Sequence, residues 1–163
     1  MSFSSEIKEE LSKVNNFRDK KILEAEFLGY ILTGNVVSNY EYIEFITENE
    51  FNIERFYKIL FNLGIDYEPS IRGKVFVATI KVTDDVRKYM EINLDAEEEV
   101  KKAIVKGAFL GAGSVNDPNK QYHLEITFGE RNNSEYILNI CKSFGVFLKT
   151  LEFKERYTIY IKE

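Results

Sequence analysis

The feature that most constrains the fold of this chain is an internal duplication, because its second half repeats its first. Residues 24–38 (EAEFLGYILTGNVVS) match residues 101–115 (KKAIVKGAFLGAGSV), and small side chains recur at the same places in both, namely Ala25, Gly29 and Thr33, then Ala103, Gly107 and Gly111. Each trio is spaced i, i+4, i+8, which places its members on one stripe of a helix. Further along, residues 43–45 match residues 124–126, an offset of 81. Self-similarity at one long period predicts two equivalent halves.

Each copy reads as helix, strand, strand, helix, strand, strand. Apolar residues at helical spacing predict a first helix at about 21–33 and 97–111, and a second at about 52–62 and 133–143. Alternating apolar and polar residues predict the strands, most clearly in YEYIEF, VFVATIKV, QYHLEITF and RYTIYIKE. Asp95 with Glu98, and Asn132 with Glu135, resemble capping boxes at helix starts. The predicted organisation is one domain, 1–163, made of a helix at about 3–13, repeat 1 (about 15–83), an acidic linker with a helix (84–96) and repeat 2 (about 97–163).

These elements predict an α+β fold in which each four-stranded sheet is covered by helices on its apolar face. Glycine inside a helix costs roughly 1 kcal/mol relative to alanine, so Gly29, Gly107 and Gly111 need a reason to be there. Close approach of two backbones supplies one. We therefore predict that the two small-residue helices pack on each other along a pseudo-two-fold axis. The alternative is that these glycines merely end helices.

Composition excludes several classes of protein. Hydrophobic residues make up 44% of the 163 residues, which is enough for a packed interior. No apolar run approaches the roughly 18 residues needed to span a bilayer, and the polar, acidic N-terminus is not a signal or transit peptide. One cysteine, Cys141, and one histidine, His123, form neither an internal disulfide nor a zinc-finger site. A cytoplasmic protein without cofactor or metal is expected.

Charge is concentrated in one segment. The formal net charge is −5, and residues 84–99 alone account for it, with seven acidic residues against two basic ones. Residues 120–163 carry seven Lys or Arg and six Asp or Glu. The chain therefore lacks the strong basic footprint of a protein that binds duplex DNA unaided.

Two such halves, meeting through small-residue helices, resemble the LAGLIDADG homing-endonuclease fold. More specifically, MSFSSEIKEEL at the start and KGAFLGAGSVNDPNKQYHLEI at 106–126 resemble the WhiA family of bacterial transcriptional regulators. That resemblance implies a degenerate LAGLIDADG-like region followed by a helix-turn-helix domain, with roles in sporulation and cell division. The chain ends at residue 163, where the family would continue into its helix-turn-helix. A fragment and a naturally short member are both compatible with this.

The resemblance also implies where a nuclease would hold its metal ions, since enzymes of this fold carry an acidic residue at the end of each motif helix. The acidic motif positions are occupied here by Leu32 and Gly34 in the first copy, and by Leu110 and Ala112 in the second. Divalent cations of this chemistry need oxygen ligands. We therefore expect no endonuclease activity.

In active relatives, the polar faces of the two sheets form a saddle over the duplex. The alternation places the following candidate nucleic-acid contacts on these faces or at their rim: Lys74, Lys81, Lys120, His123, Lys149, Lys154, Arg156 and Lys162. Glu44 and Glu125 occupy matched positions inside the faces, where we expect them to pair with Lys81 and Lys162 across strands. An ordinary solvated sheet face is the alternative interpretation.

The expected function is that of a catalytically inactive LAGLIDADG-like domain in a WhiA-type, DNA-binding transcriptional regulator. DNA would be bound mainly through a helix-turn-helix domain that this chain lacks, and a protein partner is a further expectation. The alternative is a stand-alone protein-interaction module, and an active homing endonuclease is third. A monomer is expected, because the internal duplication already completes the saddle.

Overall fold

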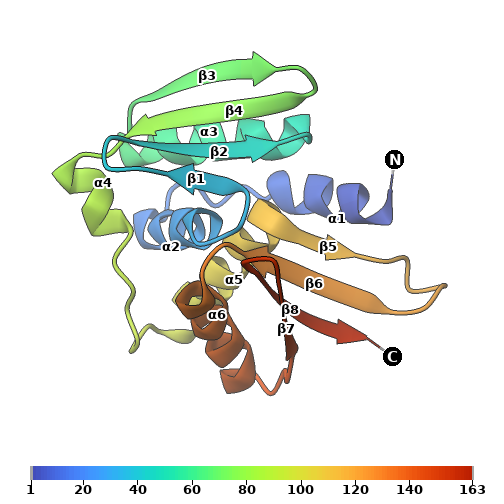
Figure 1. The fold of residues 1–163 in the computed structure, drawn as a ribbon. Helices are drawn as coiled ribbons and strands as arrows, with labels where there is room; N and C mark the ends of the chain where they lie inside the picture. Colours follow the sequence, from blue (N-terminus) through green and yellow to red (C-terminus); the bar gives the residue numbers. More distant parts are fainter. Residues whose placement is uncertain (1, 163) are drawn as a thin grey trace.

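The computed structural model describes residues 2–162, and it builds the two halves from the same series of elements (Figure 1). The first half consists of α2 (Lys20–Ile31), β1 (Val36–Ser38), β2 (Tyr42–Thr47), α3 (Glu50–Leu63), β3 (Tyr67–Arg72) and β4 (Val75–Lys81). The second half consists of α5 (Glu98–Ala112), β5 (Gly113–Val115), β6 (His123–Phe128), α6 (Arg131–Ser143), β7 (Lys149–Phe153) and β8 (Arg156–Lys162). Helix α1 (Phe3–Ser12) precedes both halves, and α4 (Asp84–Tyr89) follows β4.

Each half contains one antiparallel four-stranded sheet, in the order β1-β2-β4-β3 in the first and β5-β6-β8-β7 in the second. The register repeats as well, since Ile43 lies opposite Ile80 and Leu124 lies opposite Ile161. The predicted α+β fold of two α-β-β-α-β-β repeats is confirmed. Strand β3 continues to Arg72, and the chain reverses into β4 at Gly73, which has a positive φ.

Two apolar cores lie between the sheets and the helices, and the central helices α2 and α5 contribute to both. The first core contains Phe27, Tyr30, Phe45 and Phe56, together with Leu110 from α5. The second core contains α6 and β8 side chains together with residues from α2, namely Ala25, Leu28 and Leu32. Each central helix therefore buries one face in its own half and another face in the opposite half, which ties the halves into one unit.

The two predicted capping boxes do not form. Helix α5 begins after Glu97 and helix α6 begins after Glu130, and neither cap residue makes a side-chain hydrogen bond. Side-chain caps occur instead at Asp19, Asn49 and Thr83, which each accept a hydrogen bond from the backbone N–H three residues later. No helix within residues 2–162 is long and apolar enough to cross a membrane.

Candidate nucleic-acid interface

The centre of the molecule is the contact between α2 and α5, where the glycine stripes lie (Figure 1). A side chain at Gly29 would collide with the backbone carbonyl oxygen of Ile104, and one at Gly107 would collide with that of Glu26. At Gly111, a Cβ atom would lie 2.7 Å from the Thr33 hydroxyl. Ala25 and Ala103 are both buried. The glycines are therefore needed where one helix backbone passes directly over the other.

Both helices end side by side in this region, and side-chain amides from the opposite half cap their last carbonyl groups. The Asn52 Nδ2 donates to the Leu110 carbonyl at 2.6 Å, and the Asn133 Nδ2 donates to the Leu32 carbonyl at 3.2 Å. Asn52 and Asn133 are themselves 81 residues apart, so the two caps are related by the duplication. The exposed carbonyls of a helix end need partners, and here neutral amides supply them.

Three more contacts close these ends across the boundary between the halves. The Asn35 Nδ2 donates to the Gly111 carbonyl at 2.8 Å, and the Arg156 guanidinium donates to the Gly34 carbonyl at 2.9 Å. The Gly34 N–H donates to the Thr127 carbonyl at 2.9 Å. The positive charge of Arg156 suits the negative end of a helix dipole.

The buried link to Asn52 continues into the first core. The Tyr30 hydroxyl donates to the Asn52 Oδ1 at 2.6 Å. Complete burial, together with the nearby Glu26 carboxylate, holds the pKa of Tyr30 well above its ordinary value. The hydroxyl therefore stays protonated at neutral pH and orients the amide that caps α5.

The four positions where the resemblance places acidic residues carry hydrocarbon or no side chain at all. Leu32 and Leu110 are buried, at 7% and 0% exposure, and each packs into the core of the opposite half. Gly34 and Ala112 follow at the helix ends. Within residues 2–162, no group of three or more His, Cys, Asp or Glu side chains could hold a metal ion.

The sheet register decides which predicted contact residues share a face. Because Ile126 and Ile159 are buried in the second core, the alternating residues of β6, β7 and β8 face the opposite way. We call this side of the second sheet, which faces away from its helices, the second groove face. It includes His123, Glu125, Lys149, Phe153, Arg156, Thr158, Tyr160 and Lys162. Lys154 lies in the β7–β8 turn, with its ammonium 5.3 Å from the centre of the Phe153 ring.

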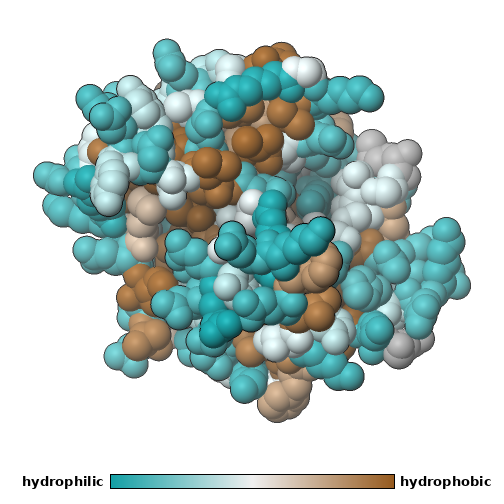
Figure 2. Space-filling model, viewed as in Figure 1, coloured by the Kyte–Doolittle hydropathy of each residue, from teal (hydrophilic) through white to brown (hydrophobic). Residues whose placement is uncertain are grey.

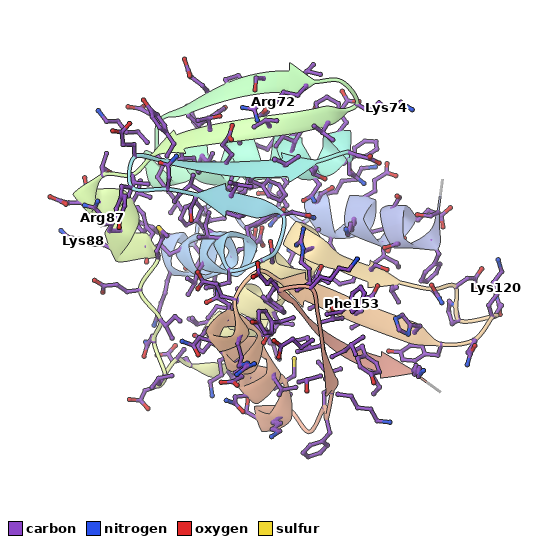
Figure 3. All side chains as sticks on the ribbon, viewed as in Figure 1. Arg72, Lys74, Arg87, Lys88, Lys120 and Phe153 are labelled. Carbon is purple, nitrogen blue, oxygen red and sulfur yellow. The ribbon has the colours of Figure 1, made fainter. Side chains whose placement is uncertain are left out.

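The remaining predicted lysines lie at the edges. Lys74 lies in the β3–β4 turn and Lys120 in the loop before β6, and Figure 3 shows both near the tips of their hairpins. Lys81 ends β4, where Tyr42 is its partner across the sheet. The structure thus brings four predicted residues, His123, Lys149, Arg156 and Lys162, onto one face and leaves the other four at turns, loops or a strand end.

Both expected Glu–Lys pairs are wrong. Glu44 pairs with Arg72 and accepts a hydrogen bond from Thr79, the residue directly opposite it, because Lys81 lies two positions further along β4. Arg72, on β3, was missed because nothing in the sequence gives the register between the two hairpins.

In the second half, the Glu125 carboxylate lies 3.4 Å from the His123 Nε2 on the same strand, and not beside Lys162. His123, one of the predicted nucleic-acid contacts, is half-buried and stacks on Tyr160 with ring centres 6.2 Å apart. Within residues 2–162, neither Lys81 nor Lys162 has an ion-pair partner.

The two groove faces differ in chemistry. On the first groove face, which is the corresponding side of the first sheet, Arg72 and Lys81 are balanced by Glu44 and Glu68. Val37, Ile46 and Val77 lie on the same side of the sheet. Figure 2 shows apolar atoms gathered over β1, β2 and β4. The second groove face also exposes apolar side chains, Leu151 and Phe153, but it carries Lys149, Arg156 and Lys162 against the single carboxylate of Glu125, so the two faces differ in net charge. The second face is therefore the one suited to phosphate oxygens.

Comparison with known proteins decides the family. Residues 101–163 match the family model described as the WhiA LAGLIDADG-like domain. Over its whole length the chain is 33% identical to the "Probable cell division protein WhiA" of Lachnospira eligens, and 30% identical to that of Ruminiclostridium cellulolyticum. Residues 101–163 belong to the WhiA family. It spans about 60% of the length of these WhiA relatives.

Solved structures show the same fold. The chain superposes on the N-terminal LAGLIDADG domain of a WhiA protein with a TM-score of 0.87, at 24% identity, covering 99% of this chain and 86% of that one. It also matches the homing endonuclease I-DmoI, solved in complex with DNA and Mn, with a TM-score of 0.61 at 15% identity. These two likenesses show that the chain shares the fold of both proteins.

Proposed function

We propose that this chain is the non-cutting LAGLIDADG-like domain of a cytoplasmic WhiA-type regulator of cell division and transcription, including sporulation where that occurs. The observation that carries the proposal is the state of the two helix ends. Their carbonyls are capped by Asn52 and Asn133, while Leu32 and Leu110 point into apolar cores. Phosphodiester cleavage by metal ions needs oxygen ligands at this place.

We further propose that the domain contacts DNA weakly, through phosphates, on its second groove face. Lys149, Arg156 and Lys162 are spaced along two adjacent strands of one face, which suits a backbone that passes over the sheet. The chain's net charge of −5 opposes strong binding. Sequence selection would then come from a helix-turn-helix domain of the longer protein, and this domain would add affinity and orientation.

A titration of fluorescent duplex DNA, followed by anisotropy at two salt concentrations, tests this contact. Non-specific binding with a dissociation constant on the order of 10⁻⁴ M or weaker is expected, with affinity falling by a slope of about −0.9 per phosphate in log–log terms. The Lys149→Gln/Lys162→Gln variant should reduce that slope by about 2. Lys58→Gln/Lys142→Gln, at exposed positions of α3 and α6, is the matched double control and should leave the slope unchanged.

Absence of binding at low salt would reject the DNA contact, and so would equal losses in the double variant and the control. The second candidate, a protein-interaction module, would then be favoured by the first groove face. There, Val37 is 59% exposed and Tyr42 is 44% exposed beside a neutralised ion pair. Such a face is better suited to a protein surface than to phosphates.

A further inference from the structure

The two halves differ in one respect, because a helix covers the outer end of the first core but not that of the second. In the first half, α4 lies over the outer end of the core. Val86 of α4 is 3% exposed within the first core, and the Tyr89 ring packs edge-on against Phe27 with ring centres 6.3 Å apart. The Tyr89 hydroxyl donates to the Leu63 carbonyl at 3.4 Å. This short helix therefore seals the end of α3 against α2.

The equivalent surface of the second half has no such cover among residues 2–162. A groove of about 460 Å³ opens there between α5, α6 and the helix-covered face of the second sheet, and its lining is almost entirely apolar. We call it the α5–α6 groove, and it is lined by Val105, Phe109, Leu124, Phe144, Val146 and Ile161, among others.

Matched residues of the two halves measure the difference. Phe144 is 36% exposed, whereas its counterpart Leu63 is 6% exposed. Val146 is 43% exposed, whereas its counterpart Ile65 is 7% exposed. Ile161 is half-buried, whereas Ile80 is fully buried. The residue types are apolar in both copies, so the second set is built for a contact that only the first set makes.

The charge around the groove indicates what kind of segment would fit. Lys102 and Lys106 line it, and the Lys8 ammonium lies 5.9 Å from the centre of the Phe109 ring. Lys102 and Lys106 already approach glutamates, but Lys8 has no ion-pair partner among residues 2–162. A segment with carboxylates at its start would complement this border. Helix α4 has that pattern, since it begins with Asp84 and Asp85.

We propose that the α5–α6 groove seats a short amphipathic helix that enters it directly from the end of β8, as α4 enters its own site from the end of β4. Ile161 lines the groove and β8 ends at Lys162, so a polypeptide that continues past β8 begins at the mouth of the groove. WhiA relatives are longer than this chain, which spans about 60% of their length. The helix would present apolar side chains at the spacing of Val86, Tyr89 and Met90. This inference does not depend on DNA binding.

The test appends a copy of residues 83–92 directly after residue 163, which reproduces the spacing between β4 and α4. Cys141 lines the groove, so its alkylation by N-ethylmaleimide reports whether the groove is covered. Burial already raises the pKa of this thiol, so all rates are compared at one pH. We expect the extension to slow alkylation at least tenfold and to abolish the fluorescence of the dye ANS. A control extension, with aspartate in place of Val86, Tyr89 and Met90, should leave the alkylation rate and the ANS fluorescence unchanged.

A second variant separates docking from a general change in folding. Val146→Lys places a charge in the groove at a position that is 43% exposed, so the domain should still fold, and it should remove the protection given by the apolar extension. The proposal is overturned if the apolar extension leaves Cys141 as reactive as before, or if both extensions protect it equally. It is also overturned if the unextended chain protects Cys141 in a concentration-dependent way, because a second copy would then be the occupant.

Discussion

Replacing Arg55 with methionine is expected to lower the free energy of unfolding by about 3–5 kcal/mol, because it leaves the buried Glu26 carboxylate with only the Lys106 ammonium, at 3.4 Å, as an ionic partner. Arg55 and Glu26 are both fully buried, and the guanidinium donates to both oxygens of Glu26, at 2.6 and 2.9 Å. Its other hydrogens reach the segment after α1, donating to the carbonyls of Ser12 and Val14 and to the Asn16 side chain. One side chain therefore connects α3, α2 and the N-terminal segment.

Urea denaturation followed by circular dichroism measures this loss, and two further variants identify its cause. The Glu26→Leu/Arg55→Met double variant should recover most of the stability, since removing both members of a buried pair costs much less than removing one. Arg72→Met breaks the partly exposed pair with Glu44 and should cost less than about 1 kcal/mol. The explanation fails if Arg55→Met costs no more than Arg72→Met, or if the double variant is less stable than the single one.

Gly107→Ala is expected to lower the free energy of unfolding by about 3 kcal/mol or more, at or above the upper end of ordinary overpacking. The added methyl group would collide with the backbone carbonyl of Glu26, and a backbone cannot rotate away as a side chain can. Alanine favours an isolated helix over glycine by about 1 kcal/mol, so the net loss would have to overcome that gain. The same reasoning applies to Gly29→Ala, which meets the Ile104 carbonyl.

Thermal and urea unfolding measure the stability of these variants. Two other glycines, Gly129 and Gly111, provide the comparison. No atom lies within 4 Å of a methyl group added at Gly129, so Gly129→Ala should be close to neutral. At Gly111 the obstacle is the Thr33 side chain, so Gly111→Ala should fall between the extremes. Equal effects at Gly107 and Gly129 would show that the helices do not depend on close backbone approach.

The fold could be predicted from the sequence because the duplication supplies two readings of each element. Neither copy of the helical stripe is decisive alone, but the matched spacing in α2 and α5 predicts one shared contact. The alternation in β2 and β6 likewise predicts two sheets with apolar faces. The spacing of apolar residues along one segment can be recognised in the sequence without any knowledge of tertiary contacts.

The contacts that join distant elements could not be predicted in the same way. Glu26 and Arg55 lie on different helices, and nothing in their spacing indicates that both are buried. The Glu44–Arg72 pair depends on the register of two hairpins. Asn52 and Asn133 are an exception, since their offset of 81 was visible in the sequence. Their role was not, because it depends on which carbonyls the helix ends leave open.

The helix ends carry Leu32 and Leu110 in place of the oxygens that would hold metal ions, so we propose that this fold no longer cuts DNA. Incubation of supercoiled plasmid DNA with the purified protein and Mg²⁺ or Mn²⁺ tests it most directly. We predict that the plasmid stays supercoiled with either metal. Metal-dependent nicking that disappears in Glu44→Gln, Glu68→Gln or Glu125→Gln, which change acidic residues on the groove faces, would show instead that this fold still cuts DNA.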